Sequence, residues 1–129
     1  MTKDKAEYIN NWLFRANEDI AVIESLVNAG VEYYTSSICF HAQQASEKFL
    51  KAYLAYHDVD FPRTHDLDFL LIECQKIDKE AFQIDFKSLT DFGVSVRYPD
   101  DFYIPDEKEA LEYRDIAISI KKIVERLIK

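Results

Sequence analysis

The 129-residue sequence has only two glycines, three prolines and two cysteines. So few turn-forming residues argue against a fold with many tight turns and favour helices joined by short loops. Neither Cys39 nor Cys74 belongs to a C-x-x-C pattern, which favours small core residues over a disulfide or a zinc site. A reducing compartment, the cytoplasm, is the simplest location for such a chain.

The sequence also lacks long apolar runs and a surplus of basic residues. No run approaches the roughly 18 apolar residues of a membrane span, and the charged start of the chain has no apolar signal core. The net charge of −8 disfavours broad nucleic-acid binding, because Lys and Arg contacts to phosphate supply most non-specific affinity. We therefore expect no membrane and no DNA partner. An RNA or nucleotide partner would need a local basic cleft.

Resident metals and cofactors are not expected either. A di-iron bundle requires two Glu-x-x-His units, and the sequence contains none. The two isolated glycines cannot form a glycine-rich phosphate loop.

What the sequence does contain is a helical period of apolar residues along most of its length. Such periods, joined by short connections, predict an all-α protein: an antiparallel up-and-down bundle of four to five helices in one domain over residues 1–129. The predicted helices are Lys5–Asn28, Tyr33–His57, a short helix from Leu67 to about Ile77, a fourth that is capped by Asp78 and ends at Phe92-Gly93, and a long final helix after Asp106.

Local signals mark several of the helix ends. Asp4 followed by Glu7 has the spacing of a capping box. Gly30 suits the end of the first helix, and Thr64 suits the cap of the third. The predicted core consists of Leu13, Ile20, Ile38, Ala45, Phe49, Leu70, Phe86, Ile116 and Ile120.

The second predicted helix carries a polar stripe between apolar faces, so several other helices should contact it. Buried polar groups need partners, since an unsatisfied one costs about 1–3 kcal/mol or more. The stripe is either a pocket for phosphate or base, or a hydrogen-bonded network that includes an i,i+4 pair of Glu47 with Lys51. Advancing each residue by about 100° places four polar side chains in one narrow arc: His41, Gln44, Lys48 and Lys51.

Two later segments add candidate site residues. Arg63 offers a planar fork for phosphate and His65 stands two residues beyond it, although this segment also suits the start of the third helix. Arg97, beside Tyr98 in a loop with proline at both ends, suits a phosphate or the carboxylates of a partner chain. A salt bridge from Arg97 to the acidic residues that follow it is an equally good interpretation.

These motifs resemble the HEPN family. The run from His41 to Leu54, the segment Pro62-Arg63-Thr64-His65-Asp66-Leu67 and Arg97-Tyr98-Pro99 occur in that family's order. The resemblance spans nearly the whole chain and implies a helical bundle that is commonly a homodimer. Many members are encoded beside a minimal nucleotidyltransferase, as a two-component system associated with nucleotide or RNA. Many are metal-independent ribonucleases.

The sequence departs from the ribonuclease branch of the family. That branch carries an Arg followed, after four to six residues, by a His in or near the final helix. No His occurs beyond His65, so Arg97 lacks this partner. Some family toxins are modified by the transferase on a Tyr shortly after the motif, and Tyr103 is a conceivable counterpart. Packing of its ring is the alternative.

Three functions remain open. The first is a nucleotide- or RNA-associated binding module, the partner of a minimal nucleotidyltransferase in a toxin–antitoxin-like pair. The second is a divergent ribonuclease toxin in which Arg97 stabilises phosphate and His41 or His65 acts as general acid or base. The third is a purely structural helical dimer. The pocket predicted for the first function consists of His41, Gln44, Lys48, Lys51, Arg63, His65, Arg97 and Tyr98.

Overall fold

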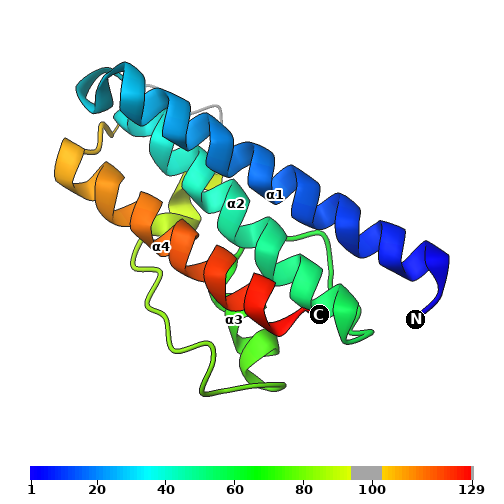
Figure 1. The fold of residues 1–129 in the computed structure, drawn as a ribbon. Helices are drawn as coiled ribbons and strands as arrows, with labels where there is room; N and C mark the ends of the chain where they lie inside the picture. The colour runs from blue at the N-terminus through cyan, green and yellow to red at the C-terminus, as the bar shows by residue number, and fades with distance from the viewer. Residues whose placement is uncertain (94–102, 129) are drawn as a thin grey trace.

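Four α-helices and two short 3₁₀ segments make up the computed structural model, which describes residues 1–93 and 103–128. α1 and α2 form a hairpin, and α4 packs on another side of α2 (Figure 1). The described residues contain no strand, which confirms the predicted helical bundle. The elements are α1 (Lys3–Gly30), η1 (Val31–Tyr33), α2 (Thr35–Tyr56), α3 (Leu67–Gln75), η2 (Leu89–Gly93) and α4 (Glu107–Leu127).

The ends of α1 are fixed by one hydroxyl and one glycine. The hydroxyl of Thr2 accepts a hydrogen bond from the backbone N–H of Lys5 at 3.1 Å, so Thr2 is the N-cap. The predicted capping box at Asp4 is therefore wrong, because Asp4 lies within the first turn of the helix. Its carboxylate stabilises the helix there by interacting with the positive end of the helix dipole. Gly30 ends α1 as predicted, with a φ of 135° that residues with side chains rarely adopt.

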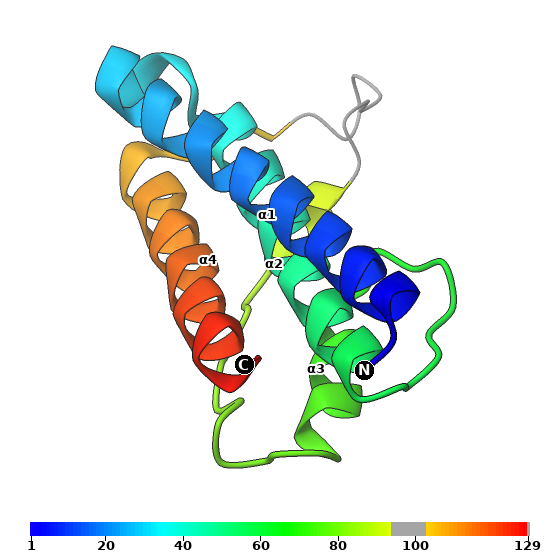
Figure 2. The ribbon, with the colours of Figure 1, turned by 45° about the vertical axis from the view of Figure 1, so that its right-hand side comes forward.

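α2 is the central helix, and it contacts α1, α3, η2 and α4. Fifteen of its 22 residues are buried, including the polar residues Gln43, Glu47 and Lys51. The prediction of a helix contacted from several sides is confirmed. Figure 2 shows the segment between α2 and α3 passing beside the N-terminal half of α1.

The predicted cap of α3 is wrong by two residues. Asp66 is the N-cap, and its carboxylate accepts hydrogen bonds from the backbone N–H groups of Asp68 and Phe69. Thr64 acts one step earlier, since its hydroxyl accepts from the backbone N–H of Asp66 at 3.1 Å. A carboxylate is the stronger acceptor at a helix N-terminus, where the dipole favours negative charge.

The predicted fourth helix does not form, and only η2 is helical between α3 and residue 93. Asp78 caps a single turn by accepting from the backbone N–H of Ala81 at 3.1 Å. Lys87 has a φ of 53°, which no right-handed helix contains. The apolar residues Phe82 and Phe86 are nevertheless fully buried, so an irregular chain places them in the core.

Seven of the nine predicted core residues are buried, and the other two, Leu13 and Ile116, pack at the edge of the core. Cys39 and Cys74 are free and buried, as small core residues. Burial raises the pKa of both thiols to about 12. Among the helices of residues 1–93 and 103–128, none combines the length and apolar character that crossing a bilayer requires.

Candidate functional site

The polar face of α2 carries two ion-pair clusters of similar chemistry. In each, a buried carboxylate is shared between a lysine of α2 and a histidine. We call them the Asp19 cluster (Asp19, His41 and Lys48) and the Glu47 cluster (Gln43, Glu47, Lys51 and His65).

The Asp19 cluster joins α1 to α2. Oδ1 of Asp19 lies 2.8 Å from Nδ1 of His41, and Oδ2 accepts a hydrogen bond from Nζ of Lys48 at 2.7 Å. His41 and Lys48 are seven residues apart, so they share one face of α2. The carboxylate can only accept, which assigns the proton to Nδ1 of His41 and leaves Nε2 for another partner.

The Glu47 cluster lies deeper. Oε2 of Glu47 accepts from Nζ of Lys51 at 3.0 Å, which confirms the predicted i,i+4 pair, and Oε1 lies 2.7 Å from Nδ1 of His65. The Lys51 ammonium also lies 5.4 Å from the Trp12 ring centroid and 5.7 Å from that of Phe61. The aromatic faces and the carboxylate together offset the cost of removing the Lys51 ammonium from water.

Two glutamines extend the polar network. The Gln43 amide donates to the backbone carbonyl of His65 at 2.8 Å, and the Gln44 amide donates to Oε1 of Gln43 at 2.7 Å. A Cβ at Gly93 would lie only 3.0 Å from Nε2 of Gln43. Glycine therefore allows the end of η2 to approach the amide closely.

The structure divides the predicted pocket. Gln44 lies next to Gln43 on the polar face, and Lys51 points into the Glu47 cluster, where the residue is only 5% exposed. Arg63 is exposed on the segment before α3. Arg97 and Tyr98 lie outside the described residues. The single arc predicted for the stripe is therefore two clusters with different depths.

Sequence reasoning did not single out Asp19, which anchors one cluster. The spacing of the sequence nevertheless indicates its position, because Asp19 stands three residues after the buried Ala16 and four before the buried Ile23. That spacing places a carboxylate on the edge of the apolar face of α1. An acidic residue in such a position needs a cationic or hydrogen-bonding partner on the next helix.

Tyr103 lies in a different part of the surface, ahead of α4. Its side chain is 56% exposed, and its hydroxyl donates to Oε1 of Glu109 at 2.8 Å. This hydrogen bond raises the pKa of the Tyr103 hydroxyl. A cavity of about 250 Å³ adjoins the ring and also contacts Lys87 and Lys108. The Tyr103 side chain is thus largely exposed on this surface, with its hydroxyl held by Glu109.

Metal chemistry has no evident centre in the part of the chain that the structure describes. No three His, Cys, Asp or Glu side chains gather there in an arrangement that could hold an ion. Both His41 and His65 use Nδ1 on a carboxylate. What the clusters offer chemically is hydrogen bonding and charge.

Comparison with known proteins gives a consistent result. Residues 9–127 match the family model described as the HEPN domain. The fold is similar to the crystal structure of an archaeal HEPN homologue, with a TM-score of 0.66 and 24% sequence identity over 94% of this chain and 98% of that chain. No curated protein matches the sequence. The family match spans both clusters and α4.

Proposed function

The chain belongs to the HEPN family, and from this premise we propose that it is a homodimeric binding module that associates with a minimal nucleotidyltransferase and contacts nucleotide or RNA. The observation that carries the proposal is the pairing of both buried carboxylates, Asp19 and Glu47, with a lysine and a histidine. Carboxylates that are already paired with cations are poor general bases, because a general base needs a free lone pair within reach of the substrate proton. Such clusters therefore suit recognition better than proton transfer.

The polar face of α2 offers the local basic surface that a nucleotide or RNA would require. The two clusters and Arg63 together hold two lysines, one arginine and two histidines against two carboxylates, within a chain of net charge −8. Lys51 is buried against Glu47, so Lys48, Arg63 and the histidines are the groups that a ligand could reach. The side chain of His65 is 65% exposed, and Arg63 is exposed beside it in the sequence. The Arg63 guanidinium can donate charge-assisted, bidentate hydrogen bonds to phosphate oxygens.

The partnership with a transferase is supported by the position of Tyr103. Its hydroxyl, on a side chain that is 56% exposed, is a suitable acceptor for a nucleotidyl group from a nucleoside triphosphate: the oxygen would bond to the α-phosphorus, pyrophosphate would leave, and Glu109 could take the hydroxyl proton. The pair would act as a toxin–antitoxin-like system in the cytoplasm, a location that the free and buried Cys39 and Cys74 favour.

Binding to the polar face is tested by neutralising Arg63. Arg63→Gln should weaken affinity for a labelled ATP analogue or a short labelled oligoribonucleotide roughly fivefold to tenfold, because one charge-assisted contact is lost. Fluorescence anisotropy at several salt concentrations measures the effect. Arg126→Gln is the matched control, since it removes the same charge from an exposed position at the end of α4. Wild-type protein that binds neither probe would contradict this part of the proposal.

The partnership is tested with a minimal nucleotidyltransferase, and the first candidate is any that is encoded beside this gene. Co-expression should give a stable complex, and light scattering should give a dimer of the isolated chain. Incubation with transferase and nucleoside triphosphate should add nucleotidyl mass to the wild type and none to Tyr103→Phe. A monomer that ignores both nucleotides and the transferase would overturn the proposal.

One contact favours a second candidate, the divergent ribonuclease toxin. Asp19 holds His41 through Nδ1 and leaves Nε2 available, as in a carboxylate-supported general base. In this candidate His41 or His65 transfers the proton and Arg97 stabilises the phosphate. Growth arrest and RNA cleavage that are lost in His41→Ala and Arg97→Ala would favour it. Intact RNA at high protein concentration would exclude it, and a dimer that binds nothing would indicate a purely structural role.

A further inference from the structure

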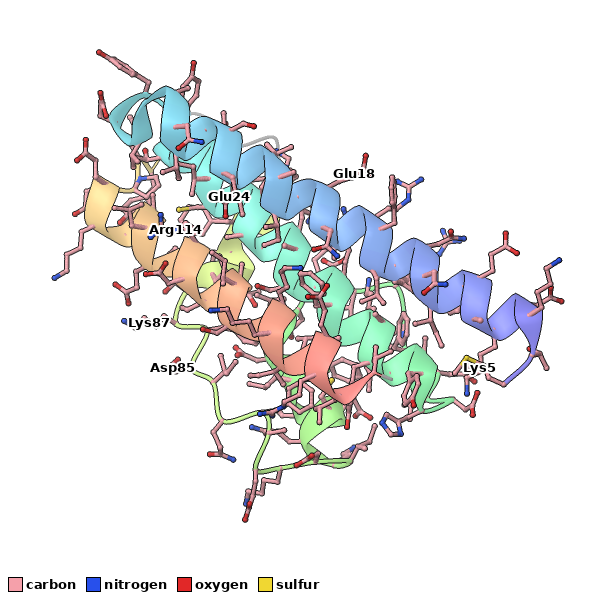
Figure 3. The ribbon with its side chains drawn as sticks, viewed as in Figure 1. Lys5, Glu18, Glu24, Asp85, Lys87 and Arg114 are labelled. Atoms are coloured by element: carbon pink, nitrogen blue, oxygen red, sulfur yellow. The ribbon has the colours of Figure 1, made fainter. Side chains whose placement is uncertain are left out.

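A cavity of about 590 Å³ lies where the first turns of α1 meet the chain that leaves α2. Lys5 and Tyr8 line it from α1, and Asp58, Asp60 and Phe61 line it from the segment after α2. Figure 3 shows Lys5 at this end of the bundle. Small-molecule sites in proteins commonly enclose about 300–1,000 Å³, so the cavity is large enough for an organic ligand.

The charge of this cavity is negative. Nζ of Lys5 lies 2.9 Å from Oδ2 of Asp58 and 6.0 Å from the Tyr56 ring centroid, so one carboxylate already holds an ammonium group. Asp60 is exposed and forms no ion pair or hydrogen bond with the described residues. The N-terminus of α1 and the C-terminus of α2 both lie at this cavity, so their dipoles oppose one another and the net charge comes from Lys5, Asp58 and Asp60.

Asp58 has a backbone conformation that is uncommon for residues with side chains. Its φ is 59°, in the left-handed region that favours glycine. The backbone N–H of Asp58 donates to the carbonyl of Ala55 at 3.1 Å, and that of Val59 donates to the carbonyl of Leu54 at 3.0 Å. These two bonds are the Schellman pattern at a helix C-terminus, where glycine is the usual residue. A carboxylate at this position therefore sits at the cavity at some conformational cost.

Aromatic rings also line the cavity. Tyr8 and Phe61 line the cavity, and the Trp12 ring lies 6.2 Å from that of Tyr8 and 6.0 Å from that of Phe61. The Lys51 ammonium already lies 5.7 Å from the Phe61 ring, so this aromatic group accepts a cation in the folded protein. Cations are attracted to the faces of such rings.

We propose that this cavity binds a monovalent organic cation with an alkylammonium or alkylguanidinium group, which pairs with Asp60 and stacks on Tyr8 and Phe61. The chain's net charge of −8 attracts such ions over a distance. A free metabolite and a Lys or Arg side chain of a protein share this chemistry. The inference does not depend on the function proposed for the polar face of α2.

The test is a titration of the intact protein with n-butylguanidinium and, as its neutral analogue, n-butylurea. Trp12 is the sole tryptophan, and its ring contacts two wall residues, so its fluorescence should change saturably with the cation. Amide shifts at positions 2–8 and 55–61 should follow the same curve. Asp60→Asn should weaken the affinity roughly fivefold or more, the loss expected for one ion pair beside aromatic walls.

Glu24→Gln is the charge-matched control, because Glu24 is exposed sixteen residues beyond Tyr8, about 24 Å along α1. It should bind like the wild type. No saturable response to the cation, an equal response to n-butylurea, or unchanged affinity in Asp60→Asn would each overturn the proposal. Once binding is established, a short Arg-containing peptide distinguishes the two sources of the natural ligand. A peptide that binds more tightly than n-butylguanidinium would identify a protein side chain as the ligand. Equal or weaker binding would identify a free cation.

Discussion

The two clusters on α2 share one chemistry and differ in depth. In the Asp19 cluster all three side chains are partly shielded, with exposed fractions of 10% for Asp19, 20% for Lys48 and 26% for His41. In the Glu47 cluster the lysine and carboxylate are only 7% and 5% exposed, whereas the histidine is 65% exposed. The first cluster bridges two helices. The second is a buried pair on one helix with a histidine at the surface.

This difference separates stability from recognition. A buried pair stabilises little as a pair, but removing one partner leaves an uncompensated charge away from water. Partly shielded groups can recover hydration when a partner is lost. We therefore expect the largest stability effects at Lys51 and Glu47, and the smallest at His65. The effect on ligand binding should follow the opposite order.

The largest effect is expected for Lys51→Met. Glu47 would keep its charge at a position that is 5% exposed, and the free energy of unfolding should fall by about 3–5 kcal/mol. Urea denaturation followed by circular dichroism measures the loss.

Two further variants make this result specific. Lys51→Met combined with Glu47→Met removes both charges and should recover most of the stability. Lys76→Met breaks the exposed pair with Glu73 and should cost about 0–1 kcal/mol. If Lys51→Met and Lys76→Met lowered the unfolding free energy equally, burial of the Lys51–Glu47 pair would not determine its effect on stability.

The next effect is expected for Asp19→Asn. Lys48 and His41 would lose their shared carboxylate but remain near water, so the unfolding free energy should fall by about 1–3 kcal/mol. Glu18→Gln is the neighbouring control on the exposed side of α1 (Figure 3) and should change stability by no more than about 0.5 kcal/mol. If Asp19→Asn lowered the unfolding free energy as much as Lys51→Met, the two clusters would not differ in how strongly burial affects their stability.

The helices and most of the core could be predicted because apolar period and local caps are properties of the sequence itself. The fourth helix could not, although Phe82 and Phe86 have helical spacing and are buried. Their burial depends on packing against other elements, which overrides local propensity and leaves Lys87 with a positive φ. Spacing identified which residues are in the core but not the backbone that places them there.

The site was predictable only within α2. Glu47 and Lys51 are one turn apart, and their pair follows from helix geometry. The contacts of Asp19 with His41 and of His65 with Glu47 cross 22 and 18 residues, respectively, and depend on how α1 and the chain before α3 pack on α2. A helical wheel of α2 alone cannot divide the stripe into two clusters.

A smaller effect is expected for Lys48→Met. Asp19 would retain its contact with His41, so the loss in unfolding free energy should be about 1 kcal/mol, below that of Asp19→Asn. Urea denaturation of both variants under one condition gives the comparison. If Lys48→Met proved more destabilising than Asp19→Asn, the lysine, and not the carboxylate, would be the centre of the cluster.

The smallest stability effect is expected for His65→Ala. Its ring is 65% exposed, and Glu47 would keep Lys51, so the unfolding free energy should fall by about 0.5–1 kcal/mol. Affinity for labelled nucleotide or RNA should nevertheless fall roughly threefold to tenfold, because an exposed polar side chain is lost from the binding face. Anisotropy and urea denaturation on the same samples separate the two quantities. A variant that binds normally but unfolds easily would make His65 a structural partner of Glu47, and the deeper cluster would then have no part in recognition.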